Sequence, residues 1–186
     1  GGFFKREARP TTKEVLAMRM LDRSVRPMFT PGYGNEVQVM SAVLSYDQEN
    51  EPEVLSMIGG MAALHISKIP IEGPMAAVRL GWVDGNILVN PTHTVLGEDR
   101  NMLDMTLSAT KDAVCMVEGG ANEMSEDVMM DAMDRAHAEI KKIIGAIEEL
   151  RTLAGVENME VAPASELDAD VVAFVETNGT DSLTEA

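Results

Sequence analysis

The chain has 186 residues, enough for one domain with a sizeable core, and its apolar and charged fractions of 45% and 25% are ordinary for a globular protein. Its formal net charge of −16 argues, on bulk charge alone, against nucleic acid as a partner, because binding nucleic acid means neutralising phosphates. The single cysteine, Cys115, excludes an intrachain disulfide and fits a reducing compartment such as the cytoplasm, and no apolar run reaches the roughly 18 residues that a membrane span requires.

In chain order, the first predicted elements are a basic loop and an amphipathic helix. Residues 3–6, Phe-Phe-Lys-Arg, have the character of a strand end that runs into a loop. Thr11 or Thr12 is a suitable N-cap for a helix over residues 13–26, where apolar side chains recur at helical spacing. Pro27 is expected to end this helix, because proline has no N–H to donate and its ring clashes with the preceding turn.

The next segments predict a strand and a buried helix. Val37 to Tyr46 is rich in β-branched and apolar residues and predicts a strand. Residues 53–67 predict a buried helix that contains Gly59-Gly60, and each glycine costs about 1 kcal/mol relative to alanine. We expect close packing of this helix against a sheet to compensate for that cost.

Two strand pairs follow. Residues 75–90 predict two strands joined by Asp84-Gly85, which is a strong hairpin signal. Residues 102–109 and 113–118 predict a second pair, which Gly119-Gly120 is expected to end.

The remainder of the chain predicts a long helix and an acidic linker. Ser125 is a suitable N-cap for the helix, and after Gly155 the composition becomes acidic with only weak helical signals. The order of elements predicts an α/β (α+β) fold with a mixed sheet and helices packed on it. We expect one domain over residues 1–155 and, over 156–186, a linker and the start of an all-α segment.

Positive charge is concentrated at the start of the chain. Residues 1–26 hold seven of the fifteen lysines and arginines but only three acids, so they carry +4 while the rest of the chain carries −20. Aromatic rings beside cations, as at residues 3–6, suit single-stranded RNA, although two core phenylalanines followed by solvated charges remain an alternative. Arg19, Arg23 and Arg26 share one stripe of the first helix and could grip phosphates, the alternative being a solvated helix face.

Four carboxylates are candidates for a magnesium site, because clustered carboxylates can hold Mg²⁺. They are Glu98, Asp99, Asp104 and Asp112. Turn chemistry explains the first two better, so we expect no metal ligands in this chain.

The histidines and the cysteine give no catalytic signal. None of the three histidines lies at metal-ligand spacing with another histidine or with Cys115. His65 lies in an apolar helix and is interpreted as a core residue with its hydrogen bonds satisfied. Cys115 alternates with apolar neighbours and is expected to be buried and inert.

Several short motifs fall in an order and spacing typical of one known family. Residues 1–7, Gly-Gly-Phe-Phe-Lys-Arg-Glu, followed by Arg9-Pro10, are similar to the Phe-Phe-Arg-Arg loop of polynucleotide phosphorylases. Residues 21–27, Leu-Asp-Arg-Ser-Val-Arg-Pro, resemble that family's Asp-Arg-Pro-x-Arg-Pro. Further blocks that resemble the family lie at 35–39, 62–67, 110–114 and 116–120. The resemblance covers residues 1–155, so the chain is expected to be an internal segment of such a protein.

The resemblance implies an RNase PH-like domain, of the ribosomal protein S5 domain 2-like fold, within a phosphate-dependent 3′-to-5′ exoribonuclease that releases nucleoside diphosphates. The resemblance implies a cytoplasmic homotrimer that uses inorganic phosphate as co-substrate and requires Mg²⁺ bound outside this segment. It also implies association with other RNA-degradation proteins. The first such domain is usually catalytically silent and helps to form the channel for single-stranded RNA. The residues that the resemblance assigns to RNA are Phe3, Phe4, Lys5, Arg6, Arg9, Arg19, Arg23 and Arg26.

Three departures from the family pattern bear on catalysis. Lys5 stands where arginine is usual, which keeps the charge but loses bidentate geometry. Residues 51–56, Glu-Pro-Glu-Val-Leu-Ser, replace a Ser/Gly-rich or Gly-Gly-Thr-Arg phosphate loop and would repel phosphate. Asp104-Met105-Thr106 replaces an Asp-x-Lys pair. We therefore predict no phosphorolysis by this segment alone. The competing hypotheses are a stand-alone RNase PH-type enzyme and an acidic α/β interaction domain without an RNA role.

Overall fold

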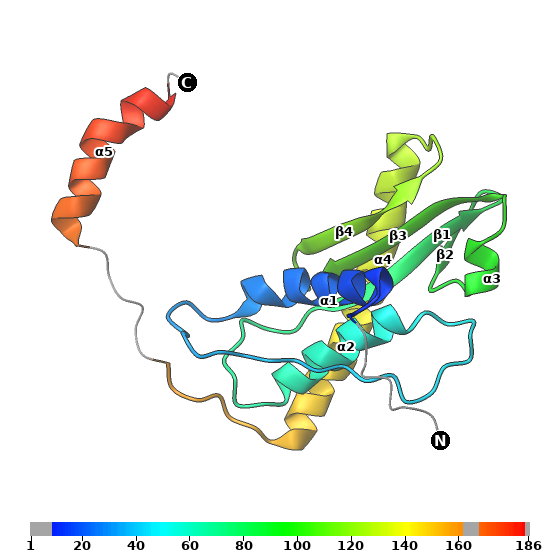
Figure 1. Ribbon diagram of the computed structural model, residues 1–186, viewed down its shortest axis with the longest axis horizontal. Coiled ribbons are helices and arrows are strands. Elements are labelled where there is room, and N and C mark those ends of the chain that lie inside the picture. Colours follow the sequence, from blue (N-terminus) through cyan, green and yellow to red (C-terminus); the bar gives the residue numbers. More distant parts are fainter. Residues whose placement is uncertain (1–8, 162–167, 185–186) are drawn as a thin grey trace.

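The computed structural model describes residues 9–161 and 168–184. At its centre lies a four-stranded sheet in the order β2-β1-β3-β4, and every pairing between these strands is antiparallel (Figure 1). The strands are β1 (Ala76–Val83), β2 (Asn86–Val89), β3 (Asn101–Ala109) and β4 (Val114–Ala121). The expected α/β fold is confirmed, and the parallel pairing that a mixed sheet needs is not found among the described strands.

Helices cover both faces of the sheet and give three layers. Helix α4 (Glu126–Ala154) packs on one face, and α1 (Thr12–Val25) and α2 (Pro52–His65) pack on the other. The shorter described helices are η1 (Arg26–Met28) and α3 (His93–Leu96), and α3 was not predicted from the sequence. Helix α5 (Ala169–Thr184) lies away from the three layers in Figure 1.

Helix α1 begins with a capping box. The Thr11 hydroxyl accepts the backbone N–H of Glu14 at 3.2 Å, and the Glu14 carboxylate accepts the N–H of Thr11 at 2.6 Å. This second bond is the main reason why the pKa of Glu14 is lowered. At the other end the α-helix stops at Val25, and Pro27 lies in the 3₁₀ turn η1, as predicted.

Gly60 in α2 allows two helices to approach closely. A Cβ atom at this position would lie 3.1 Å from Leu21 Cδ1 and 3.3 Å from Val39 Cγ1. The expected packing of α2 on the sheet is present through Met57 and Met61, and the close approach at Gly60 itself is made to α1 and the Val39 segment.

The turns and the caps of α4 follow the sequence signals. Asp84 and Gly85 have φ values of 50° and 83°, the left-handed conformation that a tight two-residue hairpin needs at both positions. Ser125 caps α4 by accepting from the backbone N–H of Val128 at 3.5 Å. Gly155 closes the same helix in the left-handed conformation, with φ 62° and ψ 33°.

The strand predicted over residues 37–46 is wrong. This segment forms none of the described strand pairings. Val37 and Val39 pack instead against the core beneath α1 and α2, and Ser41 Oγ lies 2.8 Å from Ser56 Oγ of α2. A β-branched pattern predicts a strand only where another strand can supply the hydrogen bonds, and here helices are the neighbours.

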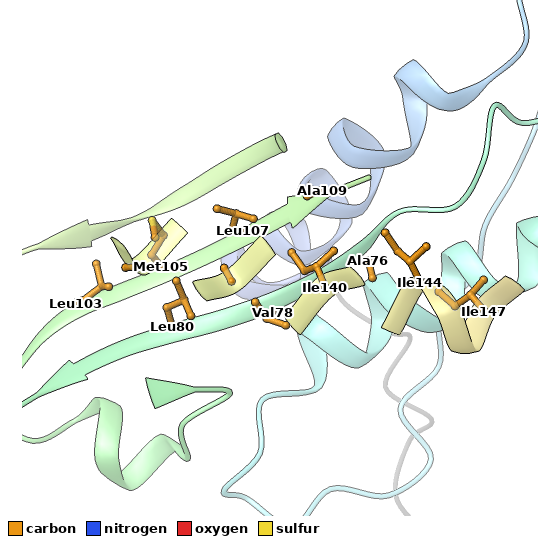
Figure 2. Close-up of a cluster of buried hydrophobic side chains, with 12 residues drawn as sticks. Ala76, Val78, Leu80, Leu103, Met105, Leu107, Ala109, Ile140, Ile144 and Ile147 are labelled. Atoms are coloured by element: carbon orange, nitrogen blue, oxygen red, sulfur yellow. The ribbon is translucent and has the colours of Figure 1, made fainter. Parts of the chain in front are cut away.

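The two faces of the sheet have different cores. Alternate residues of β1 and β3 point to α4 and meet its apolar stripe, as Figure 2 shows. This cluster includes Ala76, Val78, Leu80, Leu103, Met105, Leu107, Ile140, Ile144 and Ile147. On the opposite face, Met57 and Met61 of α2 are fully buried beside Ala77.

Candidate functional site

A cleft of about 580 Å³ lies between α1 and the sheet. Leu16 and Met20 of α1 form one wall, and residues 118–122 of β4 and its following turn form another. Arg79 of β1 and Asp104 of β3 contribute charge to the floor. Because their neighbours Val78 and Leu103 point to α4, the period of two along a strand directs both charged side chains to the cleft.

Arg79 and Asp104 form a bidentate ion pair. The Arg79 Nε and Nη2 groups donate to the two Asp104 carboxylate oxygens at 2.7 and 2.8 Å. In the pairing of β1 with β3, Asp104 lies opposite Gly81 and Arg79 opposite Thr106, so the ion pair is a diagonal contact between two neighbouring strands. The bond to Asp104 raises the pKa of Arg79, which therefore carries its charge at all relevant pH values.

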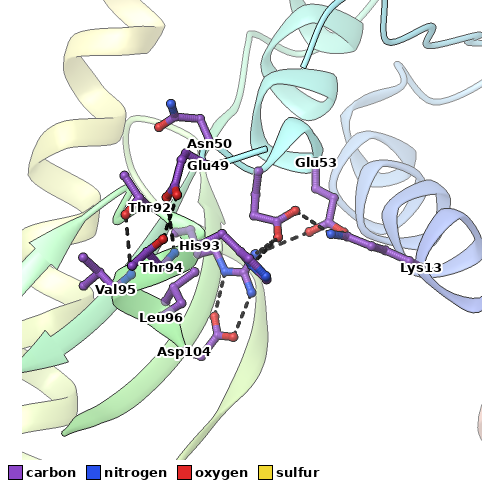
Figure 3. Close-up of polar contacts among 12 residues, drawn as sticks. Lys13, Glu49, Asn50, Glu53, Thr92, His93, Thr94, Val95, Leu96 and Asp104 are labelled. Atoms are coloured by element: carbon purple, nitrogen blue, oxygen red, sulfur yellow. Dashed lines mark hydrogen bonds and ion pairs between the residues drawn. The ribbon is translucent and has the colours of Figure 1, made fainter. Parts of the chain in front are cut away.

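The start of α2 adds two more carboxylates to this pair. Arg79 Nη1 lies 3.6 Å from Glu53 Oε2 and 3.9 Å from Glu51 Oε1, and Lys13 Nζ of α1 lies 2.6 Å from Glu51 Oε2. Burial, followed by the nearby charge of Glu51, raises the pKa of Glu53. Figure 3 shows Lys13, Glu53 and Asp104 reaching the same network from three different elements.

This network does not fit Mg²⁺ or phosphate. Each of its carboxylates faces a lysine or arginine of the chain itself, so a cation would have to displace Arg79 or Lys13. In the part of the chain that the structure describes, no three His, Cys, Asp or Glu side chains gather as a metal site. Of the four carboxylates weighed from the sequence, Asp104 pairs with Arg79 and Glu98 pairs with Arg100.

The arginines of α1 have different surroundings. Arg19 and Arg23 lie one helical turn apart and are exposed, and Arg23 Nη1 is 3.6 Å from Glu118 Oε2 on the rim of the cleft. Arg19 has no ion pair among the described residues. Arg26 donates to both oxygens of Asp22 at 2.7 and 2.9 Å, so its charge is already matched.

The remaining candidates for RNA contact are less defined. Arg9 is exposed at the start of the described chain. Phe3, Phe4, Lys5 and Arg6 lie outside the described residues. The structure therefore places Arg23 beside Glu118 of the cleft and Arg19 one turn away on the exposed face of α1, and the predicted role of the first residues is left to experiment.

Sequence reasoning missed Arg79 and Lys13. Arg79 is the one charged residue within the apolar run of β1, and a lone charge in a buried strand is a signal that it has a partner. Its partners come from β3 and from the start of α2, so only the fold reveals them. From the sequence, Lys13 belongs to the basic opening segment and the first helix, and nothing local indicates its partner at the start of α2.

His65 and Cys115 differ in part from expectation. His65 is buried, but its Nδ1 atom has no hydrogen-bond partner among the described residues, which corrects the expectation of a satisfied side chain. Burial and then the charge of Arg151 lower the pKa of His65. Cys115 is partly rather than fully buried, and burial raises the pKa of its thiol, which favours the unreactive thiol form.

The described helices include none with the length and apolar character to cross a membrane.

Comparison with known proteins identifies the family. Models of the 3′ exoribonuclease family match the chain with domain 1 over residues 1–70 and domain 2 over residues 73–139. The boundary between them falls where the chain passes from α2 to the sheet.

Individual relatives agree with this match. The polyribonucleotide nucleotidyltransferase of Thermomicrobium roseum is 52% identical over 166 residues, which are 89% of this chain and 21% of that protein. The enzyme of the same name from Persephonella marina is 44% identical over 100% of this chain and 26% of its own length. The chain thus spans about a quarter of the length of these curated relatives.

The fold agrees as well. The crystal structure of rice (Oryza sativa) Rrp46 superposes with a TM-score of 0.60 at 15% identity, covering 80% of this chain and 68% of that one. From its two domain matches and its close likeness to polyribonucleotide nucleotidyltransferases, the chain belongs to the 3′ exoribonuclease family of RNase PH type.

Proposed function

We propose that this chain is the part of a phosphate-dependent 3′-to-5′ exoribonuclease that holds single-stranded RNA without cleaving it. The whole enzyme would use inorganic phosphate and Mg²⁺ and release nucleoside diphosphates. It would act in the cytoplasm as a homotrimer and associate with other RNA-degradation proteins. Residues 1–155 would form its first RNase PH-like domain, and residues 156–186 would lead into a helical segment.

One observation supports the proposal that this chain does not itself cleave RNA. The segment where a catalytic domain of this family would carry its phosphate loop holds Glu51 and Glu53 instead, and Asp104 beside them lacks the family's following lysine. Lys13 and Arg79 form ion pairs with these three carboxylates. Three carboxylates and two cations give this network a net charge of −1, which disfavours a phosphate group, and a metal ion would have to break the ion pairs that the carboxylates already make.

The RNA-holding role rests on α1. Arg19 has no ion pair among the described residues, and Arg23 has only a long, exposed contact with Glu118, so both guanidinium groups are available to phosphates. In this proposal Phe3, Phe4, Lys5 and Arg6 add stacking and charge, and Arg9 and Arg26 contribute less.

The test compares RNA binding of the 186-residue chain with that of Arg19→Met/Arg23→Met, using fluorescent oligo(A) at several salt concentrations. Loss of two phosphate contacts should lower the slope of log K against log salt by about 1.4, since each contact to single-stranded nucleic acid contributes about 0.7. A matched control is Arg100→Met/Arg135→Met, which removes the same charge from two exposed arginines that pair with acids elsewhere.

The silent role is tested separately with poly(A), inorganic phosphate and Mg²⁺. We expect no nucleoside diphosphate from the 186-residue chain. Release of ADP would contradict the silent role, and equal salt slopes for both double variants would contradict the grip by α1.

A further inference from the structure

The Glu51 carboxylate is contacted by three nitrogen-bearing side chains from three elements. The carboxylate lies 2.6 Å from Lys13 Nζ of α1, 3.2 Å from His93 Nδ1 of α3 and 3.9 Å from an Arg79 nitrogen of β1. The Glu51 side chain is only 5% exposed, although it carries a charge and caps no backbone N–H of α2. A buried carboxylate that caps no helix must be stabilised by its ion-pair partners, and the same ion pairs fix the positions of those partners.

Helix α1 depends on this contact at one end. All four of its buried residues, Met20, Leu21, Ser24 and Val25, lie in its second half. In the first half, Val15 and Ala17 are only partly buried and Leu16 and Met18 are 46% and 60% exposed, so apolar packing is weaker there. The Lys13–Glu51 ion pair is the shortest polar contact between this half and the rest of the described chain.

A second polar contact fixes the other end. Ser24 Oγ lies 2.7 Å from Ser108 Oγ of β3 in a fully buried position, and Ser24 also bonds the carbonyl of Met20 at 2.8 Å. Lys13 and Ser24 are eleven residues apart, so the two contacts hold α1 at points roughly 16 Å apart along its axis. Arg19 and Arg23 lie between these two points.

We propose that Lys13, Glu51 and Arg79 are positioning residues that fix α1 so that Arg19 and Arg23 face the RNA. This inference rests on the proposed function. In it, the ion pairs that exclude phosphate from the cleft act on RNA through the helix, and none of the three residues touches the nucleic acid.

The decisive experiment measures oligo(A) binding by Glu51→Gln and Glu118→Gln in the 186-residue chain. Both variants remove one negative charge near the basic helix, so simple electrostatics predicts tighter RNA binding for both. Glu118 contacts Arg23 directly and competes with phosphate for it, so Glu118→Gln should bind tighter. Positioning predicts the opposite sign for Glu51→Gln, with a rise in Kd of about tenfold, the effect of losing one charge-assisted contact to phosphate.

A second variant covers the case in which Glu51→Gln unfolds, which circular dichroism would show. Lys13 is 58% exposed, so Lys13→Met should fold, and Lys13→Arg should restore binding by keeping the ion pair. The charge-matched control is Lys142→Met on α4, where the lysine pairs, among the described residues, with Glu139 of its own helix. We expect Lys13→Met to bind RNA more weakly than Lys142→Met.

Hydrogen exchange gives a readout that needs no RNA. In Glu51→Gln, amides in the first half of α1 should exchange faster, while those of α4 should not change. Unchanged exchange in α1, or RNA binding by Glu51→Gln as tight as that of the unaltered chain, would overturn the inference. Failure of the unaltered chain to bind oligo(A) would instead overturn the proposed function, and the exchange result tells the two failures apart.

Discussion

Replacing Arg79 with methionine should destabilise the fold, because it leaves three carboxylates without their shared cation. The Arg79 side chain is 17% exposed and makes two short bonds to Asp104, with Glu53 and Glu51 at 3.6 and 3.9 Å. Removing one partner of a buried ion pair costs about 3–5 kcal/mol. Because Asp104 is 47% exposed, water compensates for part of this loss, and we expect a cost near the lower limit, about 3 kcal/mol.

Thermal unfolding followed by circular dichroism measures this cost. For a chain of this length, 1 kcal/mol shifts Tm by about 2–4 °C, so Arg79→Met should lower Tm by about 6–12 °C. The control is Arg100→Met, which also removes an arginine with two acidic partners, but at a position where the side chains are exposed. Its Tm should stay close to that of the unaltered chain. Equal Tm values for the two variants would refute the view that the network in the cleft is a buried, mutually dependent unit.

Two further outcomes follow from close packing and from burial. Gly119→Ala should destabilise the chain by about 1–3 kcal/mol, since the new Cβ would lie 2.3 Å from the backbone oxygen of Asp104. Gly120→Ala, with open space around it, should leave the unfolding free energy nearly unchanged, and urea titration of both variants measures the difference. His65 has a folded-state pKa below its ordinary value of 6.5, because of burial and then Arg151, so the unfolded chain binds the proton more readily. Stability should therefore fall as pH drops below about 6.5, and the gap in unfolding free energy between the unaltered chain and His65→Gln should change between pH 7.5 and 5.5. Parallel pH profiles for the two proteins would contradict this assignment.

Local sequence signals predicted the described elements wherever the cause of an element is itself local. The N-cap, expected at Thr11 or Thr12 and found at Thr11, and the left-handed pair Asp84-Gly85 depend on residues only a few positions apart. The strand expected at 37–46 failed because a strand is completed by its neighbours, and the neighbours here are α1 and α2. Helix α3 was not predicted because it has only four residues and no periodicity to detect.

The candidate site was predictable only in part for the same reason. The acidic character of residues 51–56 and the Thr106 substitution indicated a cleft unsuited to phosphate, and the arginine stripe was visible from helical spacing. The partners of these residues were not visible, since Arg79 is 25 residues from Asp104 and 28 from Glu51 in the sequence. Ion pairs between distant segments follow from topology, and no local pattern indicates them.

The alternation of charge and apolar side chains along β1 and β3 also protects the alignment of the two strands. A slip of one residue in a strand exchanges the sides to which all its side chains point. Such a slip in β1 would drive the Arg79 guanidinium into the wholly apolar space beside Ile140 and Ile144, and would turn Val78 toward the charged cleft. A misaligned folding intermediate would have to bury the Arg79 guanidinium without water or a carboxylate partner, which is costly. The charged residues of the cleft floor therefore also disfavour incorrect pairing of β1 and β3 during folding.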